Sequence, residues 1–149
     1  MNEFPIVQLI YASTHTPGRI TSPQATYRDI LSTAQRSNAA SDISGCLIFD
    51  GQTFIQLLEG DRAAIGATFE RIRRDRRHRD IRVLGSQSCL HRTFAGSPMK
   101  GFVRSSALES ALTDEGLTGI LHPRSLDGDV VFSLAERLAS FDGNSLRYT

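Results

Sequence analysis

Residues 44–60 read SGCLIFDGQTFIQLLEG, and this stretch decides the fold. It contains two strand-like runs, 44–50 and 52–59, which meet at Asp50-Gly51. That dipeptide tolerates the positive backbone angles of a tight turn, so the stretch predicts a β-hairpin.

A glutamine stands in the middle of the second of these runs. Side chains alternate across a strand, so Gln56 shares a face with Phe54 and Leu58. A buried amide without a partner costs about 1 to 3 kcal/mol, so Gln56 needs one. Tyr11, in an apolar run near the N-terminus, has a hydroxyl with the same need. From spacing alone we favour a structural hydrogen bond between Tyr11 and Gln56, with a role at a ligand as the alternative.

The stretches around the hairpin complete the order of elements. Ser22 can cap a helix whose first turn contains Pro23, and the buried stripe of that helix includes Tyr27 and Leu31. We predict a strand at 4–12, a helix at 23–38, the hairpin, a helix from Gly60-Asp61 to about Asp75, a strand at 81–85 and a short strand at 101–104. This order is typical of a ferredoxin-like α+β domain, in which two helices cover one face of a mixed sheet.

The opposite face of that sheet needs a cover of its own. Residues 106–113 and 127–141 both have helical patterns, and we assign them to this face. The chain would then consist of a domain at 1–104 and a helical extension at 105–149, packed on the same domain.

The composition of the chain argues against several classes of function. The chain has 149 residues, 40% of them hydrophobic, and lacks a run of about 20 apolar residues and a secretory signal, so we expect a soluble cytoplasmic protein without membrane contact. A net charge of +1 offers no general field for nucleic acid. The four histidines and two cysteines lack metal-ligand spacing, and no nucleophile with a base stands out, so neither a metal site nor an enzyme is expected.

Three polar features have two readings each. Asn38 is either the C-terminal cap of the first helix or a contact to a ligand edge that has a donor and an acceptor. Residues 71–79 hold six arginines and His78, and form either a solvated helix end or a phosphate contact; they lack the interleaved aromatic residues of a nucleic-acid site. Glu59 and Asp61 flank Gly60, and we expect them to be a solvated pair rather than a catalytic one.

Several motifs in order resemble the BLUF family of blue-light photoreceptors. They are Leu9-Ile10-Tyr11-Ala12-Ser13, Ser37-Asn38 with Ile43 to Phe49, Phe54-Ile55-Gln56-Leu57-Leu58-Glu59-Gly60, Asp75 to Asp80, and Phe94 to Met99. The resemblance spans roughly residues 6 to 103.

The resemblance implies a non-covalently bound flavin between the two helices, FAD with FMN as an alternative. It implies that Tyr11 and Gln56 lie near the ring, that Asn38 holds its polar edge, and that an electron and a proton leave Tyr11 with Gln56 as the relay. The remaining flavin contacts that it implies are Ile30, Phe54 and Ile72 around the ring, and Arg77 and His78 at the mouth of the pocket.

Output is expected to depend on the strand that bears Met99, although Met99 as core filler is an equal alternative. Many relatives have a Trp two residues before this Met, whereas this chain has Ser97 there and no Trp anywhere; Ser37 also replaces a frequent Asn. We expect a short photoreceptor that forms homo-oligomers and signals to a partner protein through its C-terminal helices or sheet. The alternative is a non-photoactive ferredoxin-like module that binds a ligand or a protein.

Overall fold

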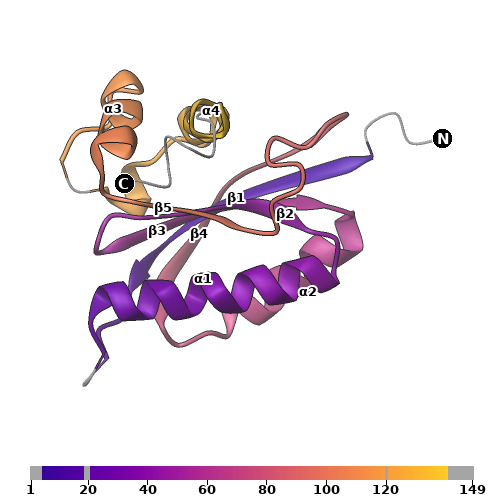
Figure 1. Ribbon diagram of the computed structural model, residues 1–149, viewed down its shortest axis with the longest axis horizontal. Helices are drawn as coiled ribbons and strands as arrows, with labels where there is room; N and C mark the ends of the chain where they lie inside the picture. Colours follow the sequence, from indigo (N-terminus) through magenta and orange to yellow (C-terminus); the bar gives the residue numbers. More distant parts are fainter. Residues whose placement is uncertain (1–4, 19–20, 120, 141–149) are drawn as a thin grey trace.

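A computed structural model describes residues 5–18, 21–119 and 121–140. A five-stranded sheet with the order β4-β1-β3-β2-β5 forms its centre (Figure 1). The elements are β1 (Ile6–His15), α1 (Pro23–Ala40), β2 (Ser44–Phe49), β3 (Thr53–Gly60), α2 (Arg62–Arg73), β4 (His78–Cys89), β5 (Lys100–Val103), α3 (Ser106–Asp114), the short 3-10 helix η1 (Pro123–Ser125) and α4 (Gly128–Ala139). The predicted ferredoxin-like α+β order is confirmed.

The hairpin of β2 and β3 forms as predicted. Phe49 pairs with Phe54 next to the turn, and Gly51 has a φ of 102°, which favours glycine. The Asp50 carboxylate accepts hydrogen bonds from the backbone amides of Gln52 and Thr53 and so fixes the turn. β5 pairs with β2 in parallel, and this pairing makes the sheet mixed.

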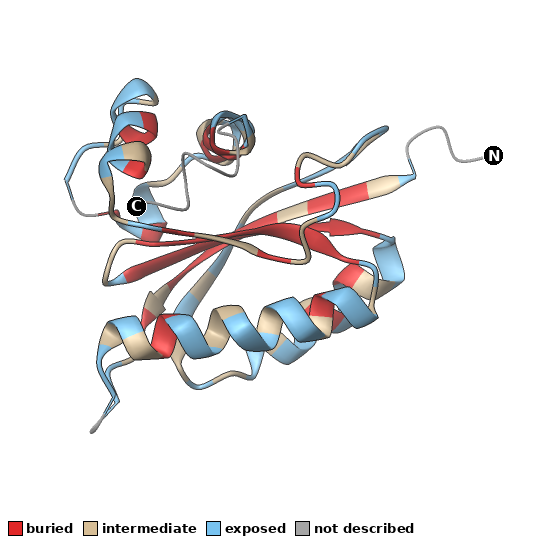
Figure 2. Ribbon diagram, viewed as in Figure 1, coloured by how far each residue is buried: buried red, intermediate tan, exposed pale blue. Residues whose placement is uncertain are grey.

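Two helical layers enclose the sheet, with α1 and α2 on one face and α3 and α4 on the other (Figure 1). Strands β2 and β3, at the centre of the molecule, are buried along their whole length (Figure 2). One core cluster contains Leu108, Leu112, Leu134 and Leu138 from the α3 and α4 layer. The other lies under α1 and α2. The cover predicted for the second face is therefore present.

Two strands differ from their predicted bounds. β1 extends to His15 rather than ending at residue 12, and Phe4 lies outside the described residues. β4 runs for 12 residues rather than five, because it pairs with β1 along its whole length while its side chains stay largely exposed at the sheet edge. An edge strand needs no apolar pattern, so the sequence did not indicate where β4 begins and ends. α4 ends at Ala139, and residue 141, the predicted end, lies outside the described residues.

Local capping explains where the helices begin. The side chains of Ser22, Asp61, Ser105 and Asp127 each accept a hydrogen bond from a backbone amide in the first turn of α1, α2, α3 and α4, respectively. Within the described part of the chain, no helix combines the length and apolar character that a membrane crossing requires.

Candidate functional site

A cavity of about 220 Å³ lies between α1, α2 and the sheet. Aliphatic and aromatic side chains make up much of its wall, and a few polar groups interrupt them. Its lining consists of Tyr11, Ile30, Thr33, Ala34, Ser37, Asn38, Leu47, Phe54, Gln56, Thr68, Arg71, Ile72, Asp75, Arg77 and His78. The eight residues predicted to hold a cofactor are all among them. Met99 does not line the cavity, but its sulfur contacts Gln56, which does.

Tyr11 and Gln56 are directly opposite each other on β1 and β3. Both side chains belong to the face covered by α1 and α2, and they are only 2% and 4% exposed. Tyr11 also packs against Phe69 of α2, with 5.4 Å between ring centroids. Burial raises the pKa of Tyr11 well above its usual value, and the negative charge of Asp75 adds to this effect. The phenol therefore keeps its proton at neutral pH.

The amide nitrogen of Gln56 donates its hydrogen bond to a residue other than Tyr11. The nitrogen donates to the Met99 sulfur at 3.9 Å, and among the described residues no hydrogen bond joins Gln56 to Tyr11. The structural Tyr11–Gln56 bond favoured from spacing is therefore absent. The only fully enclosed side-chain nitrogen or oxygen without a partner in the described residues is His15 Nε2. The Tyr11 hydroxyl and the Gln56 carbonyl oxygen are thus accessible from the cavity and free to bind a ligand.

Asn38 is buried in the last turn of α1 and lines the cavity. Its Nδ2 donates to the Pro98 carbonyl at 2.9 Å, which leaves its amide oxygen available. The prediction of a C-terminal cap at this position is wrong. The helix continues to Ala40 with Ser41 as its cap, and Asp42 has the left-handed backbone, with a φ of 53°. The side chain of Asn38 faces the cavity because helical spacing aligns it with Ile30 and Ala34.

His78 lies at the start of β4 and is held at both ring nitrogens. Nε2 is 2.7 Å from the carbonyl oxygen of Ile72 and therefore donates to it, and Nδ1 is 2.7 Å from Ser13 Oγ, a hydroxyl that can donate or accept. These two contacts fix the orientation of the ring. The ring packs beside Tyr11 and edge-on to Phe54, at centroid distances of 6.5 and 6.4 Å.

Arg77 and Asp75 form an ion pair on the cavity wall. The Asp75 carboxylate accepts two hydrogen bonds from Arg77 Nε, at 2.9 and 3.0 Å, and one from its backbone amide at 2.9 Å. Burial opposes ionisation of Asp75, but the hydrogen bonds and charge of Arg77, with the charge of His78, lower its pKa overall. The hydrogen bond to Asp75 raises the pKa of Arg77 despite partial burial. Both groups are therefore charged at neutral pH.

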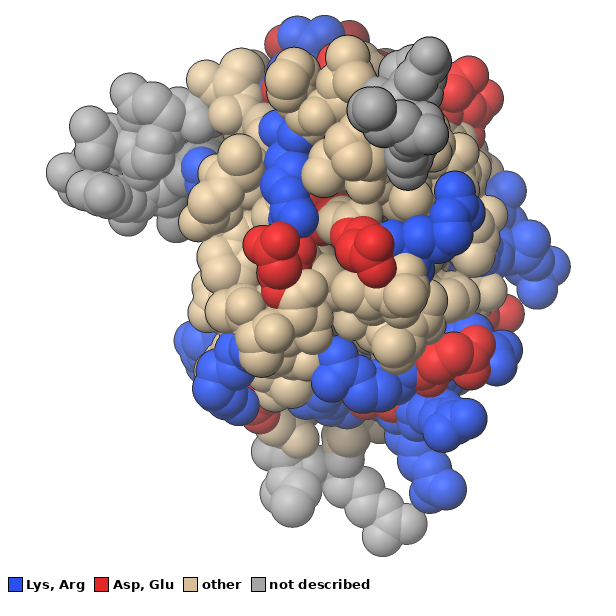
Figure 3. Space-filling model, turned by 90° about the vertical axis from the view of Figure 1, so that its right-hand side faces the viewer, with Lys and Arg blue, Asp and Glu red and all other residues tan. Residues whose placement is uncertain are grey.

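The reading of residues 71–79 as a solvated helix end is only partly correct. α2 ends at Arg73, Arg79 already belongs to β4, and Arg71 and Arg77 line the cavity. All arginines of this run except Arg77 are exposed, and basic side chains gather over the α1 and α2 layer (Figure 3).

Sequence reasoning missed several lining residues that a periodicity argument identifies. On α2, Arg71 and Ile72 lie three and four residues after Thr68, and on α1, Thr33 and Ala34 lie three and four residues after Ile30. Residues at this spacing share a helix face, so Ile30 and Ile72 predict their neighbours. Asp75 follows α2 and gave no such signal.

The expectation of a solvated Glu59–Asp61 pair is wrong for Glu59. Asp61 caps α2 and is exposed, but Glu59 is 0% exposed. Alternation along β3 places Glu59 on the sheet face away from the cavity, together with Ile55 and Leu57. Its hydrogen-bond donors come from β1, β2 and the chain after β4.

Taken together, the cavity has apolar walls, a phenol and two carboxamides with free atoms, and a charged pair. A flat ring with donors and acceptors on one edge matches this set. The cavity is smaller than the roughly 300 to 1,000 Å³ of typical ligand pockets, so it suits the ring of a cofactor better than a whole dinucleotide.

Comparison with known proteins agrees with this chemistry. The model of a family described as "Sensors of blue-light using FAD", BLUF, matches residues 6–100. The structure of BlsA in its photo-activated state superimposes with a TM-score of 0.80 at 27% identity, covering 92% of this chain and 96% of that one. The dark-state structure of BlrB, a BLUF protein, gives a TM-score of 0.74 at 27% identity, covering 92% and 97%.

Two curated proteins also match over shorter stretches. The blue light- and temperature-regulated antirepressor BluF of Escherichia coli (strain K12) is 37% identical over 76 residues, which are 51% of this chain and 18% of that protein. The photoactivated adenylate cyclase subunit beta of Euglena gracilis is 42% identical over 52 residues, which are 35% of this chain and 6% of that protein. The matching stretches are therefore small parts of both relatives.

Proposed function

Because the chain belongs to the BLUF family of blue-light sensors that use FAD, we propose that Tyr11, Gln56 and Met99 carry its response to light. The observation that supports this most is the pairing of Tyr11 and Gln56 across β1 and β3 at a cavity, with free atoms on both side chains. A purely structural pair would have used those atoms on each other.

The residues of the cavity have complementary roles toward the flavin. Ile30, Phe54 and Ile72 supply apolar contacts to the ring, and the free amide oxygen of Asn38 accepts from its polar edge. Arg77 and His78 lie toward the mouth, where Arg77 suits the phosphate part of the cofactor. FAD is the expected cofactor, and FMN would use the same ring contacts.

Light gives the bound flavin the power to oxidise a nearby phenol. The raised pKa keeps Tyr11 a neutral phenol. Loss of an electron would make this phenol a strong acid, so its proton would leave as well. The accessible carbonyl oxygen of Gln56 is suited to take that proton and relay it. When the electron and the proton return to Tyr11, the Gln56 amide is left in a different hydrogen-bonding state, by rotation or tautomerisation.

The size of this switch limits what it can control. Exchange of one or two buried hydrogen bonds changes the free energy by about 1 to 3 kcal/mol. A shift from 1:99 to 99:1 needs about 5.5 kcal/mol, so the response must bias a balanced element rather than drive a large change alone. The weak Gln56–Met99 contact at the start of β5 is our candidate for that element.

We further propose that the chain senses light without catalysis of its own, with residues 1–104 as the sensor and 105–149 as a packed helical extension. Output would then reach a partner protein through the exposed surfaces of α3, α4 or the sheet, within a homo-oligomer. The packing of α3 and α4 on the sheet face opposite the cavity supports this route, since strands β1 and β3 contact both layers.

An absorption spectrum before and after blue illumination tests the proposed function. The purified chain should contain flavin and show a reversible red shift. Tyr11→Phe should keep flavin bound and abolish the shift, because phenylalanine cannot supply the proton. Tyr27→Phe is the matched control, since Tyr27, on α1, is also a buried tyrosine but does not line the cavity. A normal shift in Tyr11→Phe, or a colourless chain, would contradict the proposal.

A further inference from the structure

The carboxylate of Glu59 is fully buried. It lies near the end of β3, on the sheet face opposite the cavity. Its Oε1 accepts hydrogen bonds from Ser44 Oγ at 2.9 Å and from the Phe94 backbone amide at 2.6 Å. Its Oε2 accepts from Gln8 Nε2 and from the Thr93 backbone amide, both at 2.9 Å. Each carboxylate oxygen thus accepts two hydrogen bonds, and burial of a carboxylate is tolerated only with such partners.

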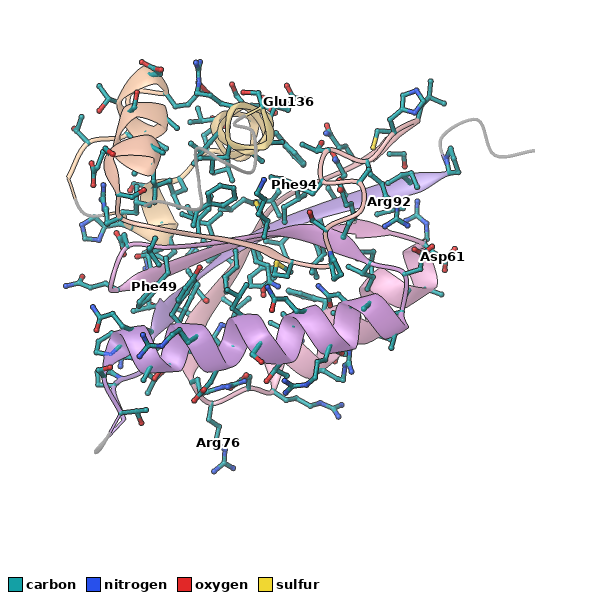
Figure 4. All side chains as sticks on the ribbon, viewed as in Figure 1. Phe49, Asp61, Arg76, Arg92, Phe94 and Glu136 are labelled. Atoms are coloured by element: carbon teal, nitrogen blue, oxygen red, sulfur yellow. The ribbon has the colours of Figure 1, made fainter. Side chains whose placement is uncertain are left out.

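Two of those donors belong to residues 92–99, which we call the crossing segment. Figure 4 labels Arg92 and Phe94 at its start, where the chain crosses from one side of the sheet to the other. Phe94 packs in the core cluster under α3 and α4, whereas Met99 packs in the cluster under α1 and α2. The position of Met99 therefore depends on how the crossing segment is held.

Further contacts fix the segment along its length. Arg92 donates to the carbonyl oxygens of Asp42 and Glu59, at 2.8 and 3.2 Å. The Ser97 carbonyl accepts from the backbone amide of Gly45 at 3.2 Å. Asn38 Nδ2 and Gln35 Nε2 donate to the carbonyl oxygens of Pro98 and Met99, at 2.9 and 3.1 Å. Among these contacts, only the Glu59 carboxylate accepts from two consecutive backbone amides, and this charged acceptor anchors the start of the segment.

We propose that Glu59 is a positioning residue for the light response: its carboxylate fixes the crossing segment and thereby holds the Met99 sulfur on the Gln56 amide. The inference rests on the proposed function for its light-dependent part only. The placement of Met99 by Glu59 is a property of the dark protein.

The carboxylate is needed because of the types of donor around it. In Glu59→Gln one oxygen becomes an NH₂ group that faces two donors. The Ser44 hydroxyl and the Gln8 amide can rotate to present an acceptor, but a backbone N–H cannot. Either the Thr93 or the Phe94 amide is thus left unpaired in that variant, and the segment is released at one of its two anchored residues.

The first test measures Met99 in the dark by NMR with ¹³C-labelled methionine methyl groups. The chain has two methionines, Met1 and Met99, so a Met99→Leu spectrum assigns the signals. Glu59→Gln should shift or broaden the Met99 signal, whereas Asp61→Asn, which removes an exposed charge two residues away, should not. An unchanged Met99 signal in folded Glu59→Gln would overturn the proposal.

If Glu59→Gln does not fold, Glu59→Asp is the second variant: it keeps the charge but withdraws the carboxylate by one methylene from the Thr93 and Phe94 amides. The Met99 signal should again move without loss of the fold. A folded Glu59→Asp protein with an unmoved signal counts against the proposal.

The second test is a double-mutant cycle on the rate of dark recovery. Glu59→Gln should change this rate by about fivefold in the parent chain and leave it unchanged in a Met99→Leu background, because Glu59 acts through Met99. An equal change in both backgrounds would mean a general effect on the fold and would overturn the role. A parent chain without any light-induced shift would instead refute the proposed function, and the NMR test would still decide the placement of Met99.

Discussion

The amide nitrogen of Gln56 donates to the sulfur of Met99, 3.9 Å away, although Tyr11 is the direct cross-strand neighbour of Gln56. A thioether sulfur is a weak acceptor, and a methionine side chain adapts easily. The Gln56 amide is therefore held in place only loosely on this side. Rotation of the amide would break only this weak hydrogen bond to Met99 and would turn a different group of the amide toward the cavity.

Met99→Leu should retain flavin and the initial photoreaction but change the lifetime of the lit state. Leucine fills a similar volume and removes the acceptor for Gln56, so the energies of the two amide orientations change. We expect the rate of dark recovery to change by about two- to tenfold, which corresponds to about 0.4 to 1.4 kcal/mol. Flash spectroscopy measures it. Recovery at the parent rate would show that the sulfur does not influence Gln56.

The light response should be insensitive to moderately alkaline pH. Because burial and Asp75 raise the pKa of Tyr11 above 10.0, its phenol stays protonated where an ordinary tyrosine ionises. At pH 9.5, about a quarter of ordinary tyrosine side chains are ionised. The amplitude of the red shift should be equal at pH 7 and pH 9.5, with circular dichroism as the check on folding. A loss of about a quarter at the higher pH would contradict the raised pKa.

His15→Phe should stabilise the protein and remove part of its sensitivity to acid. His15 is buried with Nε2 unpaired, and it packs edge-on against Phe49 and Phe54 at centroid distances of 5.9 and 6.1 Å. Phenylalanine keeps these contacts without an unsatisfied nitrogen, so the free energy of unfolding should rise by about 1 kcal/mol.

The pH dependence of that gain follows from burial, which lowers the pKa of His15 below its usual 6.5. The folded state holds the neutral ring, while the unfolded state takes up a proton below pH 6.5. The parent therefore loses stability as pH falls through 6.5, and the variant lacks this contribution. Urea unfolding at pH 7.5 and pH 5.5 measures the difference, which should be larger at pH 5.5. A gain that shrinks at the lower pH would contradict it.

Two glycine substitutions should have opposite effects on stability. A Cβ on Gly45 of β2 would lie 1.9 Å from the carbonyl oxygen of Leu57, which is backbone of the neighbouring strand and cannot move aside. Gly45→Ala should lower the free energy of unfolding by about 1 to 3 kcal/mol or more. Gly66→Ala is the control: nothing lies within 4 Å in the middle of α2, and the higher helix propensity of alanine should add about 0.5 to 1 kcal/mol. Thermal unfolding distinguishes the two, and equal shifts in Tm would refute the argument.

Much of the site was predictable because local rules position its residues. Alternation along β3 placed Gln56 with Phe54 and Leu58, and the structure puts Phe54 and Gln56 on the cavity wall. The family resemblance implied Ile30 and Ile72 as contacts, and both line the cavity. Local reasoning left Asn38 as either a helix cap or a ligand contact, and the cap is excluded because α1 runs two residues further, to Ala40.

Glu59 shows where local reasoning stops. A carboxylate beside a glycine at a strand end looks solvated in the sequence, and its neighbour Asp61 is. Two of the donors that enclose Glu59 come from Thr93 and Phe94, 34 and 35 residues later in the chain. No spacing rule connects a strand end with a segment at that distance.

The sequence by itself determined the hairpin, the helix starts at Ser22 and Asp61, and the face on which Gln56 lies, because turn geometry, capping and side-chain alternation act within a few residues. Only the tertiary structure decided that Gln56 meets Met99, that Ser13 and Ile72 hold the His78 ring, and that Glu59 is enclosed. These contacts join residues far apart in the chain, and they depend on strand register and on the packing of helical layers against the sheet, which no local pattern specifies.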